Sequence, residues 1–388
     1  MHELVIDVTR LISRCLDGRL PTGVDRVSLE YVRHFGSRAT ALVRYLRQWI
    51  VLSDADSRKV FDALLAPGPN FAKLIRCSVA RGYWLNWSTR KHGVLLNLGH
   101  NGLDEPDYAA QLRRRQMLPI FFLHDLIPLS HPEYCRAGEA EKHHLRVLTM
   151  LREGRGLIVN SADTRDALEC FASGQGVRVP PTVVASLAPS RLALTQSERP
   201  LGVPYFVMLG TIEPRKNHLM LLQLWRKMIE ELGAAAPHLV IIGQRGWECE
   251  QVVDLLERCE VLKSHVREIS DCSDAELASW LSHSQALLFP SFAEGYGMPL
   301  VEALMLGAPV LASHLGVFTE IATDIPDYLN PLDGIGWERA ILEYAKPRSL
   351  AREAQCLRMQ AFRAPTWSQH FDVVESLLER VVPQVASQ

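Results

Sequence analysis

Short apolar runs alternate with helix-patterned segments along this chain, and the alternation limits the possible folds more than any other feature. Between the apolar runs of the second half, His218–Leu232, Glu250–Leu262 and Asp274–Leu281 have helical spacing. The apolar runs, which we expect to be strands, are Tyr205–Leu209, Leu239–Ile242, Val266–Ile269, Ala286–Phe289 and Val310–Ala312. Strands that alternate with helices form parallel sheets with helices on both faces. The chain is therefore predicted to be an α/β protein.

The first half repeats this build. A helix is expected at Asp25–Phe35, and buried strands at Leu4–Val8, Val94–Leu98, Ile120–Leu123 and Gly156–Val159. The 388 residues suit two domains of roughly 150 residues each. The proline-containing segment Leu187–Pro204 is the best linker candidate. We therefore expect domains at 1–198 and 199–365, followed by a C-terminal segment 366–388 with an amphipathic helix at Trp367–Val381.

Composition indicates a globular protein of the cytoplasm. The chain is 47% hydrophobic and 22% charged, as in soluble domains. Its eight cysteines include no C-x-x-C pair, which argues against a zinc ribbon and against a disulfide framework. The N-terminus begins as a strand rather than as a signal peptide. No apolar run approaches the roughly 18 residues that a membrane-spanning helix needs.

Charge is unevenly distributed between the two halves. Residues 1–199 contain 27 Lys/Arg and 20 Asp/Glu, whereas residues 200–388 contain 15 and 24, for a net charge of −2. The basic half predicts an anionic partner, either an anionic bilayer surface or a lipid-diphosphate acceptor. A chance imbalance on solvated faces is the alternative. Nucleic acid is not expected, because the chain has no basic-aromatic stripe and no known nucleic-acid-binding module.

The stretch Phe289–Leu304 contains the strongest candidate site. It is predicted to be a strand, a glycine turn and a helix that opens at Pro299. Gly295 and Gly297 allow backbone amides to approach a ligand, and free amides at a helix N-terminus bind anions. Glu294 and Glu302 flank this turn. A phosphate-compatible turn between two carboxylates suits a nucleotide-sugar, although such a junction also occurs in α/β proteins for structural reasons alone.

Two further motifs follow predicted strands. Arg215 and Lys216 lie in the loop Gly210–Asn217, at the carboxyl edge of a sheet where α/β proteins bind ligands. Arginine can bind a phosphate bidentately, and lysine supplies a point charge; solvated charges near a helix start are the alternative. His124 and Asp125 follow the strand Ile120–Leu123. Asp54 and Asp56 have the spacing of an Asp-x-Asp metal site but lie in a polar segment, so no metal site is predicted.

Together these motifs resemble the retaining glycosyltransferases of family 4. The pattern Pro-Ser-x-x-Glu-Gly-x-Gly-x-Pro-x-x-Glu-Ala, continued by residues 307–313, is similar to that family's Glu-(seven residues)-Glu signature. Arg-Lys-Asn at 215–217, His-Asp-Leu-Ile-Pro-Leu at 124–129 and Thr-Gly-Val-Asp-Arg-Val at 22–27 also resemble it. The last two resemble the bacterial mannosyltransferase-like branch that builds O-antigen, capsule or exopolysaccharide. The resemblance implies a GT-B fold, with two Rossmann-like domains facing across a cleft and the last helix crossing back onto the first.

The resemblance also assigns expected roles. The implied catalytic residues are His124, Glu294, Arg215 and Lys216. The implied donor-binding residues are Gly23, Gly210, Arg215, Lys216, Gly243, Glu294, Gly295, Tyr296, Gly297, Met298, Pro299, Leu300 and Glu302. The implied acceptor-side residues are Arg26, His124 and Asp125, although His124 could be a structural histidine and Asp125 a cap. The match around Gly23 is looser, and a long loop is expected at Leu11–Pro21. Neither a metal nor a cofactor is implied.

The implied activity is retaining transfer of a hexose from a nucleoside diphosphate sugar to a growing, lipid-linked surface glycan. GDP-mannose is the first candidate donor, ahead of dTDP-rhamnose and UDP-glucose. The protein would be cytoplasmic, or peripheral on the inner face of the cytoplasmic membrane. Three alternatives remain: a phosphorolytic enzyme with pyridoxal phosphate, which needs a longer chain; a non-catalytic GT-B partner subunit; and an epimerase that needs no acceptor.

Overall fold

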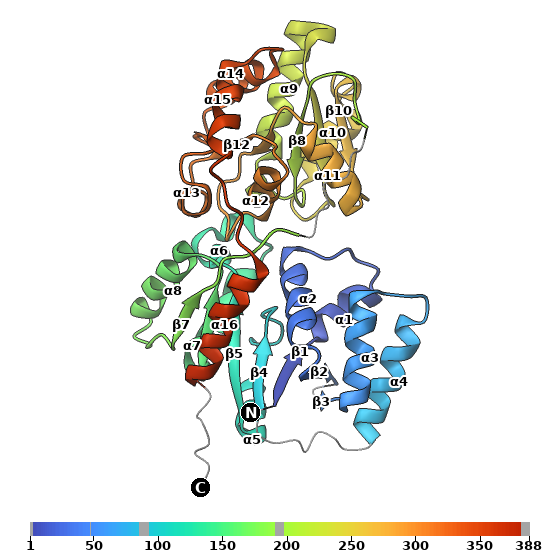
Figure 1. Cartoon of the computed structure of the whole chain (residues 1–388), viewed down its shortest axis with the longest axis vertical. Helices are drawn as coiled ribbons and strands as arrows, with labels where there is room; N and C mark the ends of the chain where they lie inside the picture. Colours follow the sequence, from blue (N-terminus) through green and yellow to red (C-terminus); the bar gives the residue numbers. More distant parts are fainter. Residues whose placement is uncertain (1–2, 47, 85–92, 191–197, 382–388) are drawn as a thin grey trace. The chain divides into compact units, whose positions relative to one another are not determined.

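The chain forms two compact α/β units. The computed structural model describes residues 3–46, 48–84, 93–190 and 198–381 (Figure 1). The first unit comprises Met1–Leu129, Gly138–Leu187 and Trp367–Gln388, and the second comprises Ser130–Ala137 and Ala188–Thr366. The chain therefore passes from one unit to the other more than once, and the segment Ser130–Ala137 belongs to the second unit although its neighbours in sequence belong to the first.

The first unit is built on a seven-stranded sheet with the order β3-β2-β1-β4-β5-β6-β7. All neighbouring strands are parallel except β2 and β3, which form an antiparallel pair. The strands are β1 (Leu4–Asp7), β2 (Ala39–Tyr45), β3 (Gln48–Val51), β4 (Gly93–Asn97), β5 (Met117–Leu123), β6 (Gly156–Val159) and β7 (Thr182–Val184). The strand order reverses between β1 and β4, and ligands bind at such a point at the carboxyl ends of parallel strands.

Helices cover both faces of this sheet. On one face, Phe121 of β5 belongs to a buried cluster with Tyr108 of α5 and Val147 of α7. On the other face, the ring of Phe122 meets Tyr31 of α2 at 6.2 Å. The helices are α1 (Thr9–Leu16), α2 (Gly23–Phe35), α3 (Asp54–Leu65), α4 (Phe71–Trp84), α5 (Tyr108–Arg115), α6 (Ile127–Ser130), α7 (Glu139–Glu153), α8 (Ala162–Gly174) and α16 (Trp367–Val381).

The C-terminal helix α16 packs on strands β6 and β7 of the first unit. Its residue His370 is almost completely buried and makes two hydrogen bonds inside that unit. Nδ1–H donates to the Ser186 carbonyl at 3.1 Å, so Nε2 accepts from the Tyr31 hydroxyl at 2.9 Å. Burial lowers the pKa of His370 to about 4, because the charged imidazolium would lose its hydration. His370 is therefore neutral in the folded protein at pH 7.

We expect the buried neutral His370 to make the protein less stable in mild acid. Between pH 6.5 and about 4 the unfolded chain takes up a proton at this residue and the folded chain does not, so stability falls as pH falls. The slope should be up to about 1.4 kcal/mol per pH unit and should level off below pH 4. Urea denaturation at pH 7.5 and 5.5 measures it. His370→Gln should reduce the slope, and the control His144→Gln, at a partly buried position on α7, should not; equal slopes in all three proteins would contradict this account.

The second unit is built on a six-stranded parallel sheet with the order β10-β9-β8-β11-β12-β13. The strands are β8 (Tyr205–Leu209), β9 (His238–Ile242), β10 (Val266–Ile269), β11 (Leu287–Phe289), β12 (Val310–Ser313) and β13 (Asp327–Leu329). The helices are α9 (His218–Leu232), α10 (Glu250–Arg258), α11 (Asp274–Ser282), α12 (Met298–Met305), α13 (Gly316–Ala322), α14 (Gly334–Ala345) and α15 (Leu350–Met359). Here the strand order reverses between β8 and β11.

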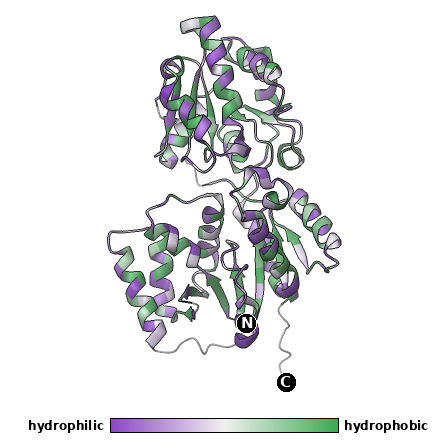
Figure 2. Ribbon diagram, turned by 180° about the vertical axis from the view of Figure 1, so that it is seen from behind, coloured by the Kyte–Doolittle hydropathy of each residue, from purple (hydrophilic) through white to green (hydrophobic). Residues whose placement is uncertain are grey.

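Alternate residues of strand β8 divide the core of the second unit into two layers. Tyr205 and Val207 pack in a cluster with residues of α11, α12 and α13. Phe206 and Met208 point to the opposite face and pack with residues of α9, α10 and α14. The sheet therefore has helices on both faces, as the alternation in the sequence predicts, and Figure 2 shows strands coloured mainly as hydrophobic between helices with mixed faces.

Most expected elements are confirmed, and a few local expectations are wrong. Much of the expected loop Leu11–Pro21 is helix α1, because Leu11 and Ile12 are buried against the unit. The expected helix Glu250–Leu262 ends at Arg258, because Cys259 is extended. Strand β3 and its antiparallel pairing were not anticipated.

Asp54 and Asp56 open helix α3, where they take part in local structure. The Ser53 hydroxyl accepts the backbone N–H of Asp56 and caps the helix. The carboxylate of Asp56 pairs with Arg81 of α4. These contacts explain Asp54 and Asp56 as residues of the first turn of a helix.

Parts of two expected features lie outside the described residues: 191–197 of the expected linker and 382–388 of the C-terminal segment. Among the described helices, none is both long enough and apolar enough to span a bilayer.

Candidate functional site

Three charged residues meet at the point where the strand order of the second unit reverses. Arg215 and Lys216 lie in the short 3-10 helix η3 (Pro214–Lys216), which follows β8. Glu294 follows β11, the neighbour of β8 in the sheet. Because β8 and β11 are parallel, the loops that follow them lie at the same edge of the sheet, which is where open α/β sheets bind ligands.

Glu294 bridges the two cations. One carboxylate oxygen, Oε1, lies 2.6 Å from Nζ of Lys216, and the other, Oε2, lies 2.6 Å from Nη1 of Arg215. Arg215 also donates from Nη1 to the Ala293 carbonyl at 2.6 Å and from Nη2 to Glu213 at 2.5 Å. The backbone N–H of Phe292 donates to the Arg215 carbonyl at 2.9 Å, so the two loops are also joined through the main chain.

This network is nearly sealed from solvent. The side chains of Lys216 and Glu294 are 9% and 8% exposed, and that of Arg215 is 18% exposed. Burial by itself would raise the pKa of Glu294, but Arg215 and Lys216 outweigh it and lower this pKa to about 2. Burial lowers the pKa of Lys216, and Glu294 opposes that effect. The positive charges of the buried Arg215 and Lys216 are therefore balanced by the Glu294 carboxylate.

The turn after Glu294 leads into helix α12. Gly297 is the residue before the helix and has φ +116°, and a Cβ there would lie 2.7 Å from the Phe318 ring. Pro299 lies in the first turn, as expected. Tyr296 and Leu300 are buried and Met298 is partly buried. Glu302 is buried on α12, where Oε1 accepts the Ser190 backbone N–H at 3.3 Å. One carboxylate of the predicted pair thus contacts the two cations, and the other contacts a backbone amide.

Gly210 and Gly243 lie at the carboxyl ends of the neighbouring strands β8 and β9. Gly210 has φ +139° and packs near the Lys216 side chain. A Cβ on Gly243 would lie 2.0 Å from the carbonyl oxygen of Gly210. The lack of a side chain at Gly243 is therefore explained by backbone packing within the sheet edge that supports Lys216.

We expect Gly243→Ala to destabilise the second unit and to weaken ligand binding there. The added methyl must push the ends of β8 and β9 apart, at a cost of about 1–3 kcal/mol. Gly202→Ala is the matched control, because a Cβ at Gly202 would have no neighbour within 4 Å. Thermal unfolding of the two variants tests this expectation, and equal melting temperatures would show that the close contact is unimportant.

Several neighbours of the network were not assigned a role from the sequence. Glu213 is buried and pairs with Arg215. It lies in the same loop motif as Arg215 but was given no role there. The Phe289 ring lies 4.8 Å below the Lys216 ammonium group. Tyr134, from the segment Ser130–Ala137, stacks on Phe292 at 5.3 Å, and its carbonyl accepts the Trp247 indole N–H at 3.1 Å. Only the spacing of Glu213 from Arg215 offered a signal in the sequence; the aromatic contacts depend on the folded chain.

In the first unit, His124 lies at the carboxyl end of β5 and is buried. Its Nε2–H donates to the Leu98 carbonyl at 2.7 Å, and its ring stacks on Phe122 at 4.4 Å. Burial lowers the pKa of His124 to about 4, while the Leu98 carbonyl opposes that effect. The hydrogen bond fixes the neutral tautomer, so Nδ1 has the lone pair.

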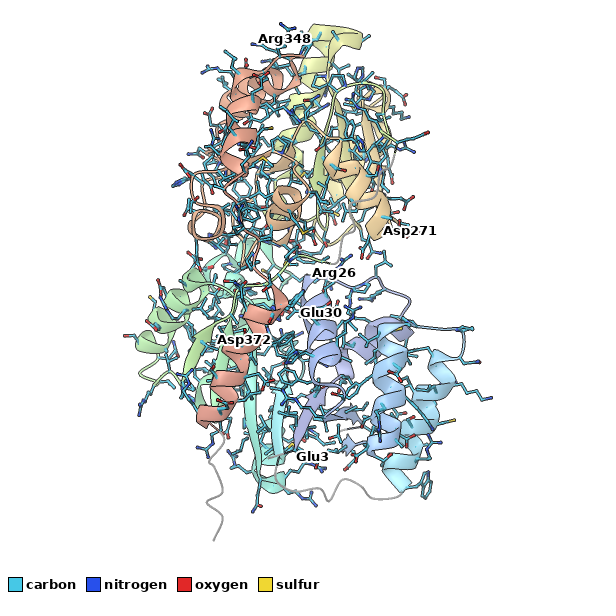
Figure 3. All side chains as sticks on the ribbon, in the orientation of Figure 1. Glu3, Arg26, Glu30, Asp271, Arg348 and Asp372 are labelled. Atoms are coloured by element: carbon cyan, nitrogen blue, oxygen red, sulfur yellow. The ribbon has the colours of Figure 1, made fainter. Side chains whose placement is uncertain are left out.

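The other first-unit candidates lie at the starts of helices α2 and α6. Asp125 caps the short helix α6 by accepting the Ile127 N–H at 3.1 Å. Gly23 is the first residue of α2, and a Cβ there would meet nothing within 4 Å. Arg26 lies in the first turn of α2, one turn before Glu30 (Figure 3).

Arg10 is a neighbour that the sequence did not single out. Its Nε lies 2.8 Å from the buried Asp25 carboxylate, and its charge contributes to lowering the pKa of His124. Asp25 also pairs with Arg14 and accepts the Thr22 N–H. This carboxylate therefore ties helix α1 to the start of α2, beside Gly23.

Residues 193–325 match the family described as glycosyl transferases group 1. The serotype-specific mannosyltransferase WbdA of Escherichia coli is 28% identical over 224 residues, which are 53% of this chain and 27% of WbdA. The O-antigen chain mannosyltransferase B of Escherichia coli is 33% identical over 129 residues, 33% of each protein. The matched motifs are those that meet at Glu294. The similarity to this glycosyltransferase family therefore covers residues 193–325, which include Arg215, Lys216 and Glu294.

The solved structures show that this chain has the GT-B fold. HepE of Anabaena, determined in complex with UDP-glucose, aligns with a TM-score of 0.68 at 14% identity over 98% of this chain and 100% of HepE. The trehalose 6-phosphate synthase of Burkholderia multivorans aligns with a TM-score of 0.61 at 13% identity over 98% of each chain. By contrast, the match to WbdA spans only about a quarter of that relative's length.

Proposed function

We propose that this protein is a retaining hexosyltransferase that uses a nucleoside diphosphate sugar as donor. The observation that supports this most is the Arg215–Lys216–Glu294 network at the strand-order reversal of the second unit. Two buried cations at the carboxyl edge of a parallel sheet can neutralise the negative charge that develops on the diphosphate as it leaves the sugar. Developing charge is then stabilised by groups that the fold already holds in place, and the proposal needs no metal ion.

In the proposed reaction the bond between the anomeric carbon and the donor phosphate breaks, and a bond to an acceptor hydroxyl oxygen forms on the same face. The departing phosphate takes the hydroxyl proton, so Glu294 is not a general base. Arg215, Lys216 and the amides of residues 295–298 bind the diphosphate. Glu294 fixes the cations and contacts the hydroxyls of the donor sugar, and Glu302 binds the ribose. His124 contributes the lone pair of Nδ1 to orient a sugar hydroxyl.

We propose mannose as the transferred sugar, with GDP-mannose as the first candidate donor. The two Escherichia coli relatives described above are named as mannosyltransferases, and one is named for the O-antigen chain. We therefore propose a growing bacterial surface glycan as acceptor, attached to a polyprenyl diphosphate. dTDP-rhamnose and UDP-glucose are the alternative donors within the same chemistry.

The basic first half supports a peripheral association with the inner face of the cytoplasmic membrane. Residues 1–199 contain seven more basic than acidic residues, as counted from the sequence. Sedimentation with anionic liposomes at low salt tests this association, because surface charge attraction is strongest there. If the protein stays in the supernatant, the membrane proposal fails and the donor proposal is unaffected.

A thermal-shift panel of nucleoside diphosphates and their sugars tests the donor site. A ligand that binds only the folded protein stabilises it by about 2.7 kcal/mol at a hundredfold excess over Kd. We expect one base to give a clear shift that EDTA does not change. Incubation of that donor with a mannose-terminated acceptor, followed by NMR of the product, should show an unchanged anomeric configuration. Inversion would refute the proposed mechanism, and the absence of any nucleotide shift would refute the proposed function.

A further inference from the structure

The first unit has a hollow of about 520 Å3 at the carboxyl ends of its central strands. Its volume lies within the range of about 300–1,000 Å3 that is usual for small-molecule sites. The hollow is lined by Thr9, Arg44, Leu46, Trp49, Asn101, Glu105, Pro106 and Asp107. Thr9 follows β1 and Asn101 follows β4, so the hollow lies where the strand order of this sheet reverses, as the charged network does in the other sheet.

Arg44 builds one wall of the hollow. Its guanidinium group is 7% exposed and pairs with Asp7 at 2.9 Å and with Glu105 at 3.1 Å. It also donates to the Asn101 carbonyl at 2.7 Å. The guanidinium lies against the backbone of Gly102, where a Cβ would overlap it. Arg44 therefore fixes the loop after β4 through bonds from all three of its guanidinium nitrogens.

Trp49 provides a hydrogen-bond donor at the hollow. The residue is 2% exposed and packs on Tyr108 at 4.9 Å, yet within the described part of the chain no hydrogen bond engages its indole N–H. The indole N–H is accessible from the hollow, so a ligand there can accept from it. Thr9 accepts the backbone N–H of Arg44 at 2.9 Å, which leaves its hydroxyl proton to donate. The hollow thus offers donors that a bound molecule would satisfy.

The charges around the hollow favour an uncharged ligand. Arg44 brings one positive charge, against the negative charges of Asp7, Glu105 and Asp107. Asp107 lies at the start of α5 without making a side-chain capping bond, so its carboxylate can accept from a ligand. Carboxylates beside a paired arginine accept hydroxyl groups and repel phosphates and uronic acids. Sugar hydroxyls both donate and accept hydrogen bonds, so they suit a lining that offers donors and carboxylate acceptors.

We propose that this hollow binds a neutral sugar unit of the acceptor glycan, with Trp49 donating to it and Asp107 accepting its hydroxyls. This inference rests on the proposed transferase function and goes further by naming the class of acceptor: hydroxyl-rich and uncharged. The selection against acidic sugars comes from the negative balance around Arg44, because a uronate carboxylate would face Glu105 and Asp107.

Saccharide binding without any donor tests the proposal directly. α-Mannotriose is titrated against the full chain and followed by saturation-transfer NMR, with methyl glucuronide as the charged comparison. We expect mannotriose to bind at least tenfold more tightly than the glucuronide. Trp49→Phe and Asp107→Asn should each raise the Kd for mannotriose about tenfold, the effect of one lost hydrogen bond of about 1.4 kcal/mol.

Matched controls lie elsewhere in the same unit. Trp84→Phe changes an exposed tryptophan at the end of α4, and Asp166→Asn changes an exposed aspartate of α8. Both controls should bind mannotriose like the unaltered protein. Because Trp49 is a core residue, Asp107→Asn keeps the test valid if Trp49→Phe fails to fold. The proposal is overturned if mannotriose does not bind, if Asp107→Asn binds it normally, or if the glucuronide binds equally well.

The nucleotide site is measured separately, so that the two proposals can fail independently. Trp49→Phe and Asp107→Asn should leave the thermal shift with nucleoside diphosphate unchanged, because these residues belong to the first unit. Normal saccharide binding together with no nucleotide shift would refute the transferase function and retain the sugar-binding hollow. Normal nucleotide shifts with no saccharide binding would refute the hollow alone.

Discussion

Lys216→Met is expected to leave a folded protein that transfers sugar at least about 10²–10³-fold more slowly, as for the loss of one donor that stabilises developing charge. The Lys216 ammonium group is buried and is 2.6 Å from Glu294. Methionine fills similar space without a charge, so the variant keeps the packing on Phe289 and loses a cation that would face the leaving diphosphate. Steady-state kinetics with a saturating acceptor measure the loss.

The control for this variant is Lys227→Met. Lys227 is half-exposed on α9, in the same unit, and pairs with Glu338 at 2.8 Å. Lys227→Met removes an ion pair with a similar N–O distance, but at a place remote from the strand-order reversal. Transfer should therefore stay within about twofold of normal. A Lys216→Met enzyme with near-normal turnover would remove Lys216 from the mechanism. Lys216→Arg should also be impaired, because the planar guanidinium does not replace an ammonium group in a closed pocket.

Glu294→Gln is expected to reduce transfer about 10²–10³-fold and to destabilise the second unit. The neutral glutamine cannot balance the positive charges of Arg215 and Lys216. Removal of one partner from a buried ion pair lowers stability by about 3–5 kcal/mol. A bound diphosphate supplies the missing negative charge. The thermal shift with a nucleoside diphosphate should therefore be larger in Glu294→Gln than in the unaltered protein. A smaller shift would mean that Glu294 serves only the sugar and does not compensate the cations.

The same variant should change the acid stability of the protein. The pKa of Glu294 is lowered from 4.5 to about 2, so its contribution to stability is complete above pH 4.5 and is lost as pH falls towards 2. The pKa difference corresponds to about 3 kcal/mol. Glu294→Gln should lack this acid-dependent loss, whereas Glu338→Gln, which alters the Lys227 pair, should retain it. Urea midpoints between pH 5 and 3 distinguish the two.

The fold was predictable because its periodic patterns are local. The strand Tyr205–Leu209 and the helix His218–Leu232 have the bounds expected from the sequence. Helix α1 was missed because only Leu11 and Ile12 are buried in its eight residues, which gives too short an apolar pattern. The antiparallel strand β3 was missed because pairing direction depends on the partner strand and not on residue spacing.

The sequence indicated the individual residues of the candidate site, but it did not predict their contacts with one another. Arg215, Lys216 and Glu294 were each singled out from their motifs, and the structure brings them together. Their contact spans 78 residues of sequence and arises because β8 and β11 are neighbours in the sheet. In the first unit, the pairing of Arg44 with Asp7 and Glu105 was not predicted, since no motif links these three positions.

The most direct test of the central claim is calorimetric titration of nucleoside diphosphate into the unaltered protein and into Lys216→Met, both in EDTA. The claim is that the buried Arg215–Lys216 pair binds the diphosphate of the donor. It predicts a measurable Kd in EDTA for the unaltered protein, one that magnesium does not improve, and a Kd at least about tenfold higher for Lys216→Met. Equal binding by the two proteins, or binding that requires magnesium, would contradict it.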